Sequence, residues 1–113
     1  MDCLFCRIVA KQIPAQTVYE DDEILAFEDI SPQAPFHALV IPKKHIDSVV
    51  SVREEDRDLV GRMVAVIAEI AITSGLQDHG FRVVTNTGER AGQSVKHLHF
   101  HILAGRDFSW PPG

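Results

Sequence analysis

The stretch His97-Leu98-His99-Phe100-His101-Ile102-Leu103 sets three histidines in strict alternation with large apolar residues. Such alternation predicts a half-buried β-strand, because successive side chains of a strand point to opposite faces. We expect the apolar side chains to face a core and the three imidazoles to line the other face. Neutral imidazole can act as a nucleophile, a general base or a metal ligand. An exposed histidine-rich strand without chemistry is the alternative, and it does not explain why three of six histidines gather here.

The composition is that of one globular domain. The chain has 113 residues, 45% of them hydrophobic, which suffices for a core without metal or disulfide support. Its 11 basic and 16 acidic residues give a net charge of −5, which argues against nucleic acid as the main partner. No apolar run has the length of a membrane span, and Asp2 stands where a signal peptide needs positive charge. We therefore expect a cytoplasmic protein with reduced cysteines and no membrane contact.

The pattern along the chain predicts strands interrupted by one long helix. The expected elements are a short helix over 3–10, strands over 17–20, 24–29, 37–42, 81–86 and 97–103, and a long helix between 51 and 75. Such an order favours an α+β fold with a largely antiparallel sheet. The strand over 37–42 is apolar on both faces and is therefore expected at the centre. Ser51 and Glu54 fit a capping box at the start of the long helix, and Gly75 fits its end.

The long helix carries more apolar surface than one buried face requires. Two neighbouring stripes run along it, the first made by Leu59, Met63, Ile67 and Ile70 and the second by Val60, Val64, Ala68 and Ala71. One stripe can lie on the sheet, and the second favours packing against another copy of the chain in a two-fold homodimer. The alternative is a helix covered on both sides by its own domain, for which a chain of this length has little material.

Four separated stretches resemble one protein family. Residues 93–103 look like the signature His-φ-His-φ-His-φ-φ of the histidine triad (HIT) family of nucleotide-binding hydrolases and transferases. Residues 29–35 and 40–45 look like its upstream blocks, and residues 110–113, Trp-Pro-Pro-Gly, are similar to the end of its Hint branch. The resemblance implies a single domain over residues 1–113 with a five-stranded antiparallel sheet and two helices. It also implies a homodimer with a continuous ten-stranded sheet.

The resemblance also assigns roles at the triad. The middle histidine, His99, takes the role of nucleophile, with a main-chain carbonyl holding its other nitrogen as N–H. Its attack on phosphorus would give a nucleotidyl-histidine intermediate. His101 and His37 would flank the phosphate as hydrogen-bond donors. Ser94 and the backbone around Gln93 and Val95 would donate to the same oxygens, where negative charge grows in the transition state.

The nucleotide contacts are implied in the same way. Asp29 resembles the family's ribose contact, where a carboxylate accepts two hydroxyls, and Ile30 resembles a base contact. Asn86 fits either a ribose or leaving-group contact or a turn-stabilising amide. Trp110 lies in a tail that the resemblance sends toward the neighbouring subunit's active site; the alternative is a frayed end. An apolar slot for the purine, or simply a core, would be formed by Phe5, Ile8, Phe27 and Leu39.

A second constellation points to a metal. Cys3 and Cys6 have the CxxC spacing of half a zinc site, whereas a thioredoxin-like redox pair would follow a strand. Candidates for the two remaining ligands are His45 and His97. The wider superfamily resemblance implies a structural zinc on this set, with no part in catalysis and no catalytic cofactor. His97 would then face the metal, and His79 is expected on the surface.

The third triad histidine suggests the reaction. Transferases of the superfamily carry glutamine where this chain has His101, and diadenosine-polyphosphate hydrolases usually carry threonine at Ser94. The resemblance therefore implies hydrolysis of the P–N bond of a purine nucleoside phosphoramidate, giving a nucleoside monophosphate such as AMP and an amine. Two alternatives stay open: a dinucleoside polyphosphate hydrolase, and a nucleotide-binding regulatory protein with incidental hydrolysis.

Overall fold

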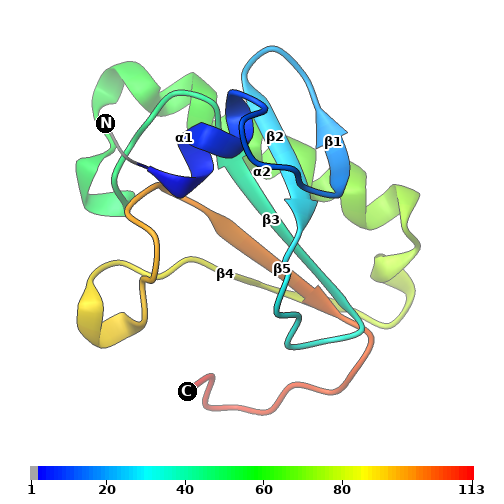
Figure 1. Ribbon diagram of the computed structural model, residues 1–113. Helices are drawn as coiled ribbons and strands as arrows, with labels where there is room; N and C mark the ends of the chain where they lie inside the picture. Colours follow the sequence, from blue (N-terminus) through cyan, green and yellow to red (C-terminus); the bar gives the residue numbers. More distant parts are fainter. Residues whose placement is uncertain (1–2) are drawn as a thin grey trace.

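The computed structural model describes residues 3–113, which form one antiparallel sheet with a helix on each face (Figure 1). The sheet has the strand order β1-β2-β3-β5-β4. Its strands are β1 (Thr17–Glu20), β2 (Ile24–Glu28), β3 (Phe36–Pro42), β4 (Phe81–Val84) and β5 (Phe100–Ala104). The helices are α1 (Leu4–Val9) and α2 (Arg57–Thr73). Short 3₁₀ turns lie at Val49–Ser51, Glu54–Asp56, Leu76–Asp78 and Glu89–Ala91. The predicted α+β class with five antiparallel strands and two helices is confirmed.

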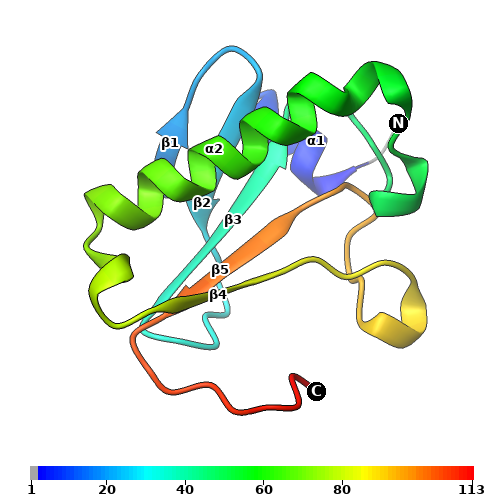
Figure 2. The same ribbon diagram turned by 180° about the vertical axis from the view of Figure 1, so that it is seen from behind.

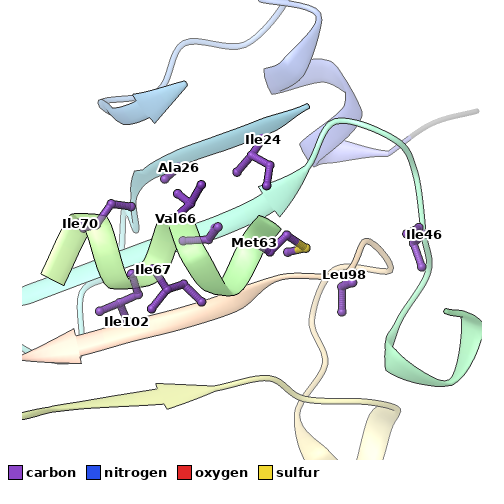
Figure 3. Close-up of a cluster of buried hydrophobic side chains, with 10 residues drawn as sticks. Ile24, Ala26, Ile46, Met63, Val66, Ile67, Ile70, Leu98 and Ile102 are labelled. Carbon is purple, nitrogen blue, oxygen red and sulfur yellow. The ribbon is translucent and has the colours of Figure 1, made fainter. Parts of the chain in front are cut away.

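The two helices cover opposite faces of the sheet, as the front and back views show (Figures 1 and 2). On the α2 side, helix residues such as Met63 and Ile67 pack on the strands; Figure 3 shows this cluster. The strand residues beneath them are Ile24, Ala26, Val40 and Ile102. On the α1 side the alternate residues of the same strands, Leu25, Phe27, Leu39 and Ile41, pack against the short helix. β3 is buried on both faces, which confirms its predicted central place.

β5 begins later than predicted, at Phe100 instead of His97. The backbone N–H of Leu98 donates to the carbonyl of Ile46 at 2.6 Å, and Nε2 of His97 donates to the carbonyl of Pro42 at 2.8 Å. These contacts replace the ladder bonds that a longer strand would make with β3. The predicted alternation of faces still holds, since Leu98 and Ile102 lie in the α2 core while the three imidazoles lie on the α1 side.

The start of α2 also differs from the prediction. Ser51 lies in a 3₁₀ turn and does not cap the helix, so the Ser51–Glu54 capping box is wrong. Asp56 stands at the N-cap position instead, and its carboxylate accepts from the backbone N–H of Arg53 at 3.0 Å and from Lys44 Nζ at 2.6 Å. The predicted end is confirmed, because Gly75 follows the helix with φ of 72°, a conformation that glycine adopts without strain.

α1 ends at Val9, one residue before the end that the sequence predicted. Lys11 adopts φ of 64°, and its N–H and that of Gln12 return to the carbonyls of Ile8 and Arg7. This is a Schellman motif with lysine at the left-handed position. None of the helices in residues 3–113 combines the length and the apolar character needed to cross a bilayer.

Candidate active site and metal centre

The three triad imidazoles divide between two sites on the α1 face of the sheet. His99 and His101 line a cavity of about 540 Å³, together with Ser94 and Val95 from the loop before β5. The ring of His97 is turned instead toward the two cysteines. The alternating segment thus supplies residues to both a candidate active site and a candidate metal centre.

The cavity has an apolar end and a polar end. Phe5 and Ile8 of α1 form one wall, with Phe27 of β2 and Leu39 of β3 beside them. Such a slot suits a flat aromatic base. The polar end contains Asp29, His37, Ser94, His99 and His101, and Ile30, 96% exposed, lies at the rim.

His99 is held in one tautomer by the main chain. Its Nδ1 lies 2.7 Å from the carbonyl oxygen of His97, and a carbonyl can only accept, so Nδ1 carries the hydrogen. The neutral ring therefore keeps its lone pair on Nε2. Phe5 packs edge-on against this buried imidazole, with the ring centroids 5.1 Å apart. A buried, oriented imidazole with one free nitrogen is the arrangement that a nucleophile needs.

His37 and His101 form a second, directed pair. The backbone N–H of Gln33 donates to His37 Nδ1 at 3.0 Å, so the hydrogen of neutral His37 is on Nε2. That nitrogen lies 2.9 Å from Nδ1 of His101, which then accepts and carries its own hydrogen on Nε2. One main-chain donor thus fixes both tautomers and leaves His101 with an N–H to offer a ligand.

Burial keeps both rings of this pair neutral. It lowers the pKa of His37 below its ordinary value and lowers the pKa of His101 to about 4, with the neighbouring rings of His99 and His37 adding to the effect on His101. Asp29 opposes both shifts, and its Oδ2 lies 3.5 Å from His37 Nε2. Asp29, His37 and His101 are near enough to one another to hold an ion. The facing nitrogens of the two histidines, His37 Nε2 and His101 Nδ1, are however already hydrogen-bonded to each other.

Gln93, Asn86 and Trp110 were expected to contact the nucleotide, but none of the three lines this cavity. The side chain of Gln93 spans the loop before β5: its Nε2 donates to the carbonyls of Asp47 and Val95, and its Oε1 accepts from the N–H of Gly88. Gln93 therefore holds the loop that carries Ser94. Asn86 is half-buried and Trp110 is 83% exposed, and neither reaches the cavity within this chain.

Three contributors, Gln33, Thr85 and Leu4, were not singled out from the sequence. The N–H of Gln33 orients His37, and a main-chain donor leaves no mark in the residue pattern. β4 ends at Val84, two residues before its predicted end, and Thr85 Oγ1 just after it donates to the carbonyl of His99 at 2.8 Å, which anchors the triad segment. Leu4 also lines the cavity, and its position on α1 next to Phe5 and one turn from Ile8 could have indicated it.

Cys3, Cys6, His45 and His97 bring four ligand atoms within 4.8 Å of one another. His97 Nδ1 lies 3.4 Å from Cys3 Sγ, 3.6 Å from Cys6 Sγ and 3.2 Å from His45 Nδ1, which in turn lies 3.3 Å from Cys6 Sγ. A tetrahedral zinc, with bonds of about 2.0–2.1 Å to nitrogen and about 2.3 Å to sulfur, sets such atoms about 3.3–3.6 Å apart. The four residues therefore form a site that can hold a metal ion and suits zinc.

Both metal-facing histidines have their second nitrogen engaged. His97 Nε2 donates to the carbonyl of Pro42 at 2.8 Å, and His45 Nε2 lies 2.6 Å from Oδ1 of Asp47. Each partner can accept, so Nδ1 of both rings is left free to bind a metal. Outer partners of this kind are what orient ligating histidines in metal sites. His79 is exposed and takes no part in this set of ligands.

Known proteins share this chain's sequence and fold over nearly its whole length. Residues 2–109 match the family described as "Scavenger mRNA decapping enzyme C-term binding". Protein HitA of Neisseria gonorrhoeae is 53% identical over 102 residues, which are 90% of this chain and 94% of that protein. An uncharacterized HIT-like protein of Synechocystis is 49% identical over 112 residues, 99% of this chain and 97% of that one.

Solved structures agree with the sequence relatives. The crystal structure of a HIT family hydrolase from Legionella pneumophila superposes with a TM-score of 0.97 at 46% identity, covering 99% of this chain and 100% of that one. A histidine triad protein from Clostridium difficile gives a TM-score of 0.92 at 50% identity, covering 96% and 95% of the two chains. With relatives of this identity over nearly its full length, and with its triad imidazoles divided between the cavity and the metal-facing cluster, the chain belongs to the histidine triad (HIT) family.

Proposed function

We propose that this protein is a Hint-type, nucleotide-binding hydrolase that cleaves the P–N bond of purine nucleoside phosphoramidates. The observation that carries the proposal is the bond from His99 Nδ1–H to the His97 carbonyl, which leaves a free nitrogen in a cavity with a base-sized apolar slot. Asp29 lines the same cavity, with its Oδ2 3.5 Å from His37 Nε2, and its carboxylate can accept the ribose hydroxyls.

In the proposed first step, His99 Nε2 attacks phosphorus and the P–N bond breaks, so that the nitrogen leaves with the electron pair. The phosphate anion beside His101 raises the pKa of that ring, so that in the bound complex His101 Nδ1 gains a proton and the hydrogen bond that it accepts from His37 Nε2 in the free protein opens. His101 Nε2 gives its proton to the leaving amine. Ser94 and the N–H of Val95, at the same end of the cavity, donate to the phosphoryl oxygens.

In the second step, water attacks the nucleotidyl-histidine. The oxygen bonds to phosphorus, the P–N bond to His99 breaks with its electrons returning to Nε2, and the water's proton goes back to the His37–His101 pair. The products are a nucleoside monophosphate and an amine, and the enzyme is regenerated. Every proton in this scheme has a donor or an acceptor within the residues that line the cavity.

The metal centre has a separate role in this proposal. Zinc held by Cys3, Cys6, His45 and His97 would be closed by four protein ligands, so its chemistry is structural, tying α1 to the sheet. Ligating thiolates need a compartment that keeps cysteines reduced, which supports a cytoplasmic location.

We also propose a two-fold homodimer with a continuous ten-stranded sheet. β4 is an edge strand, with Phe81 and Val83 partly exposed. Of the second apolar stripe on α2, Val64 is 55% exposed and Ala68 is exposed, whereas Ala71 is buried, so the stripe is uncovered in part within the chain; Ile72, beside it, is 60% exposed. Pairing of β4 with its symmetry mate would satisfy the sheet edge and cover this stripe.

The test compares turnover of adenosine phosphoramidate and diadenosine tetraphosphate by the native chain, by His99→Ala and by the surface control His79→Ala. We expect the phosphoramidate to be the faster substrate, and we expect activity to survive in His79→Ala and to be lost in His99→Ala. Quenched reactions should show a nucleotide on the His99 peptide by mass spectrometry. Faster cleavage of diadenosine tetraphosphate, or tight AMP binding with negligible turnover of either substrate, would favour the polyphosphate hydrolase or the regulatory protein.

A further inference from the structure

α1 takes part in both sites. Cys3 and Cys6 stand at its start and face the metal centre, while Phe5 and Ile8 are buried and line the nucleotide cavity. A helix of six residues is not stable by itself. Its position over the sheet therefore depends on what holds it: the apolar contacts of Phe5 and Ile8, and whatever joins the two sulfurs to the histidines.

His97 is a second connection between the sites. Its Nδ1 faces the sulfurs of Cys3 and Cys6, while its own carbonyl accepts the hydrogen of His99 Nδ1 at 2.7 Å. The ring and the carbonyl belong to one residue in an irregular segment that is not yet part of β5. A force that fixes the ring of His97 therefore also fixes the acceptor that orients His99.

The third connection runs through Asp47. Its carboxylate holds His45, and its carbonyl accepts from Nε2 of Gln93 at 2.7 Å. Gln93 also bonds the carbonyl of Val95, in the loop that supplies Ser94 to the cavity. Three segments that surround the nucleotide are thus each anchored to the four-residue cluster.

We propose that metal occupancy of the Cys3–Cys6–His45–His97 cluster sets the affinity for nucleotide and the orientation of His99. The metal performs no chemical step; it holds the cavity wall and the nucleophile in place, with His97 as the positioning residue. The proposal rests on the proposed function, because it takes the cavity to be the nucleotide site. Binding at the two sites is then coupled, and the coupling must be the same in both directions.

The first experiment measures AMP binding by the reduced, full-length chain in buffers of fixed free Zn²⁺, from metal-free to saturating. We expect the dissociation constant for AMP to fall at least tenfold on saturation, and the affinity for Zn²⁺ to rise by the same factor when AMP is bound. AMP dissociation constants that agree within twofold, in a metal-free chain that circular dichroism shows to be folded, would overturn the proposal.

A second readout does not depend on activity or on AMP. The Nδ1–H of His99, seen by ¹⁵N NMR of the imidazoles, should be slow to exchange in the zinc-loaded chain and fast in the metal-free one. If the metal-free chain unfolds, Cd²⁺ replaces Zn²⁺, because its longer bonds to sulfur change the cluster without removing the ion. A His99 signal that is identical with the two ions would contradict the coupling, and a displaced one would support it.

Asp47→Asn supplies the matched variant. Loss of the carboxylate behind His45 should weaken metal binding about 10- to 100-fold, as outer-partner substitutions do, while the main-chain bond to Gln93 stays. The Zn²⁺ concentration at which AMP affinity rises should shift by that factor, with the same final AMP affinity. A shift in metal binding without a matching shift in the AMP curve would refute the proposal. Failure of the zinc-saturated native chain to bind AMP would instead refute the proposed function, leaving the His99 signal to judge the coupling.

Discussion

His37 Nε2 lies 2.9 Å from His101 Nδ1, and the direction of this bond is set by the main-chain N–H of Gln33 on the far side of His37. Because the Gln33 N–H can only donate, His37 Nδ1 must accept and His37 Nε2 must donate to His101. The neutral His101 ring of the free protein therefore presents Nε2–H to the cavity. In the free protein each of the two neutral rings therefore carries one ring N–H, on Nε2 in both cases.

Substitution of His37 should therefore act on the chemical step. In His37→Gln, the amide can still donate to His101 but cannot take up a proton, whereas His37→Leu loses both abilities. We expect kcat for phosphoramidate to fall about 100-fold in the first variant and further in the second, within the range of general acid–base contributions. AMP affinity, measured by calorimetry, should change less than threefold in His37→Gln. A native kcat in His37→Gln would contradict a role in proton transfer, because that variant keeps only the ability to donate to His101.

The low pKa of His101 can be measured directly. Burial and the rings of His99 and His37 lower it to about 4, so NMR should show a neutral His101 down to about pH 5. Asp29 raises the pKa, so Asp29→Asn should lower it further, and bound AMP, which brings an anion, should raise it. Titration near 6.5 in the free protein would show that the ring is not buried as described.

The same shift makes stability depend on pH. Because the folded-state pKa of His101 is below its ordinary value of 6.5, the unfolded chain binds the proton more readily between pH 6.5 and about 4. The free energy of unfolding should therefore be full above pH 6.5 and decline as the pH falls through this window. We expect His101→Gln to flatten the decline by about 1 kcal/mol, allowing for solvent screening of a partly exposed ring. Urea denaturation at several pH values measures this difference.

Lys11 offers a test of the local backbone. It holds φ of 64°, which costs an L-residue about 1–2 kcal/mol, and its ion pair with Glu20 is exposed and contributes little. Lys11→Gly should stabilise the chain by about 1 kcal/mol relative to Lys11→Ala, which loses the same ion pair but keeps the strain. Equal urea midpoints for the two variants would mean that Lys11 is not left-handed in solution.

The proposed dimer depends on the uncovered face of α2. Val64→Glu and Ile72→Glu place a charge where the fold of one chain already exposes the side chain, so a monomer should tolerate them. In a dimer the charge would be buried without a partner, and sedimentation should show the mass fall by half. Val50→Glu, at a position that is 73% exposed in the turn before α2, is the control that should leave the mass unchanged.

The alternation of apolar residues and the residues that end helices and strands predicted most of this fold. The alternation of the triad segment assigned its two faces, because side-chain direction in an extended chain is fixed by parity, and the continuous apolar run over 37–42 indicated a central strand. Gly75 marked the end of α2 through a backbone requirement that few residues meet. The start of α2 was not predictable in this way, since Asp56 is stabilised there by Lys44, a residue outside the helix.

The candidate sites, like the fold, could be predicted from the sequence only in part. The CxxC spacing and the resemblance named the residues of the metal cluster and the triad, and the structure brings both groups together. What the sequence could not show is which main-chain groups orient them. The carbonyls of His97 and Pro42 and the N–H of Gln33 decide the tautomers, and a residue name carries no information about where its peptide group points.

Leu98 and Ile102 enter the α2 core from the same segment whose histidines serve the opposite face, so its two functions are interleaved one residue at a time. A codon inserted between His99 and Phe100 would turn every following residue of β5 to the opposite face, placing His101 beneath α2 and Ile102 in the cavity. Natural or designed insertions and deletions should therefore be confined to the loops on either side of this segment. A point substitution within the segment, in contrast, changes only the face on which that side chain lies.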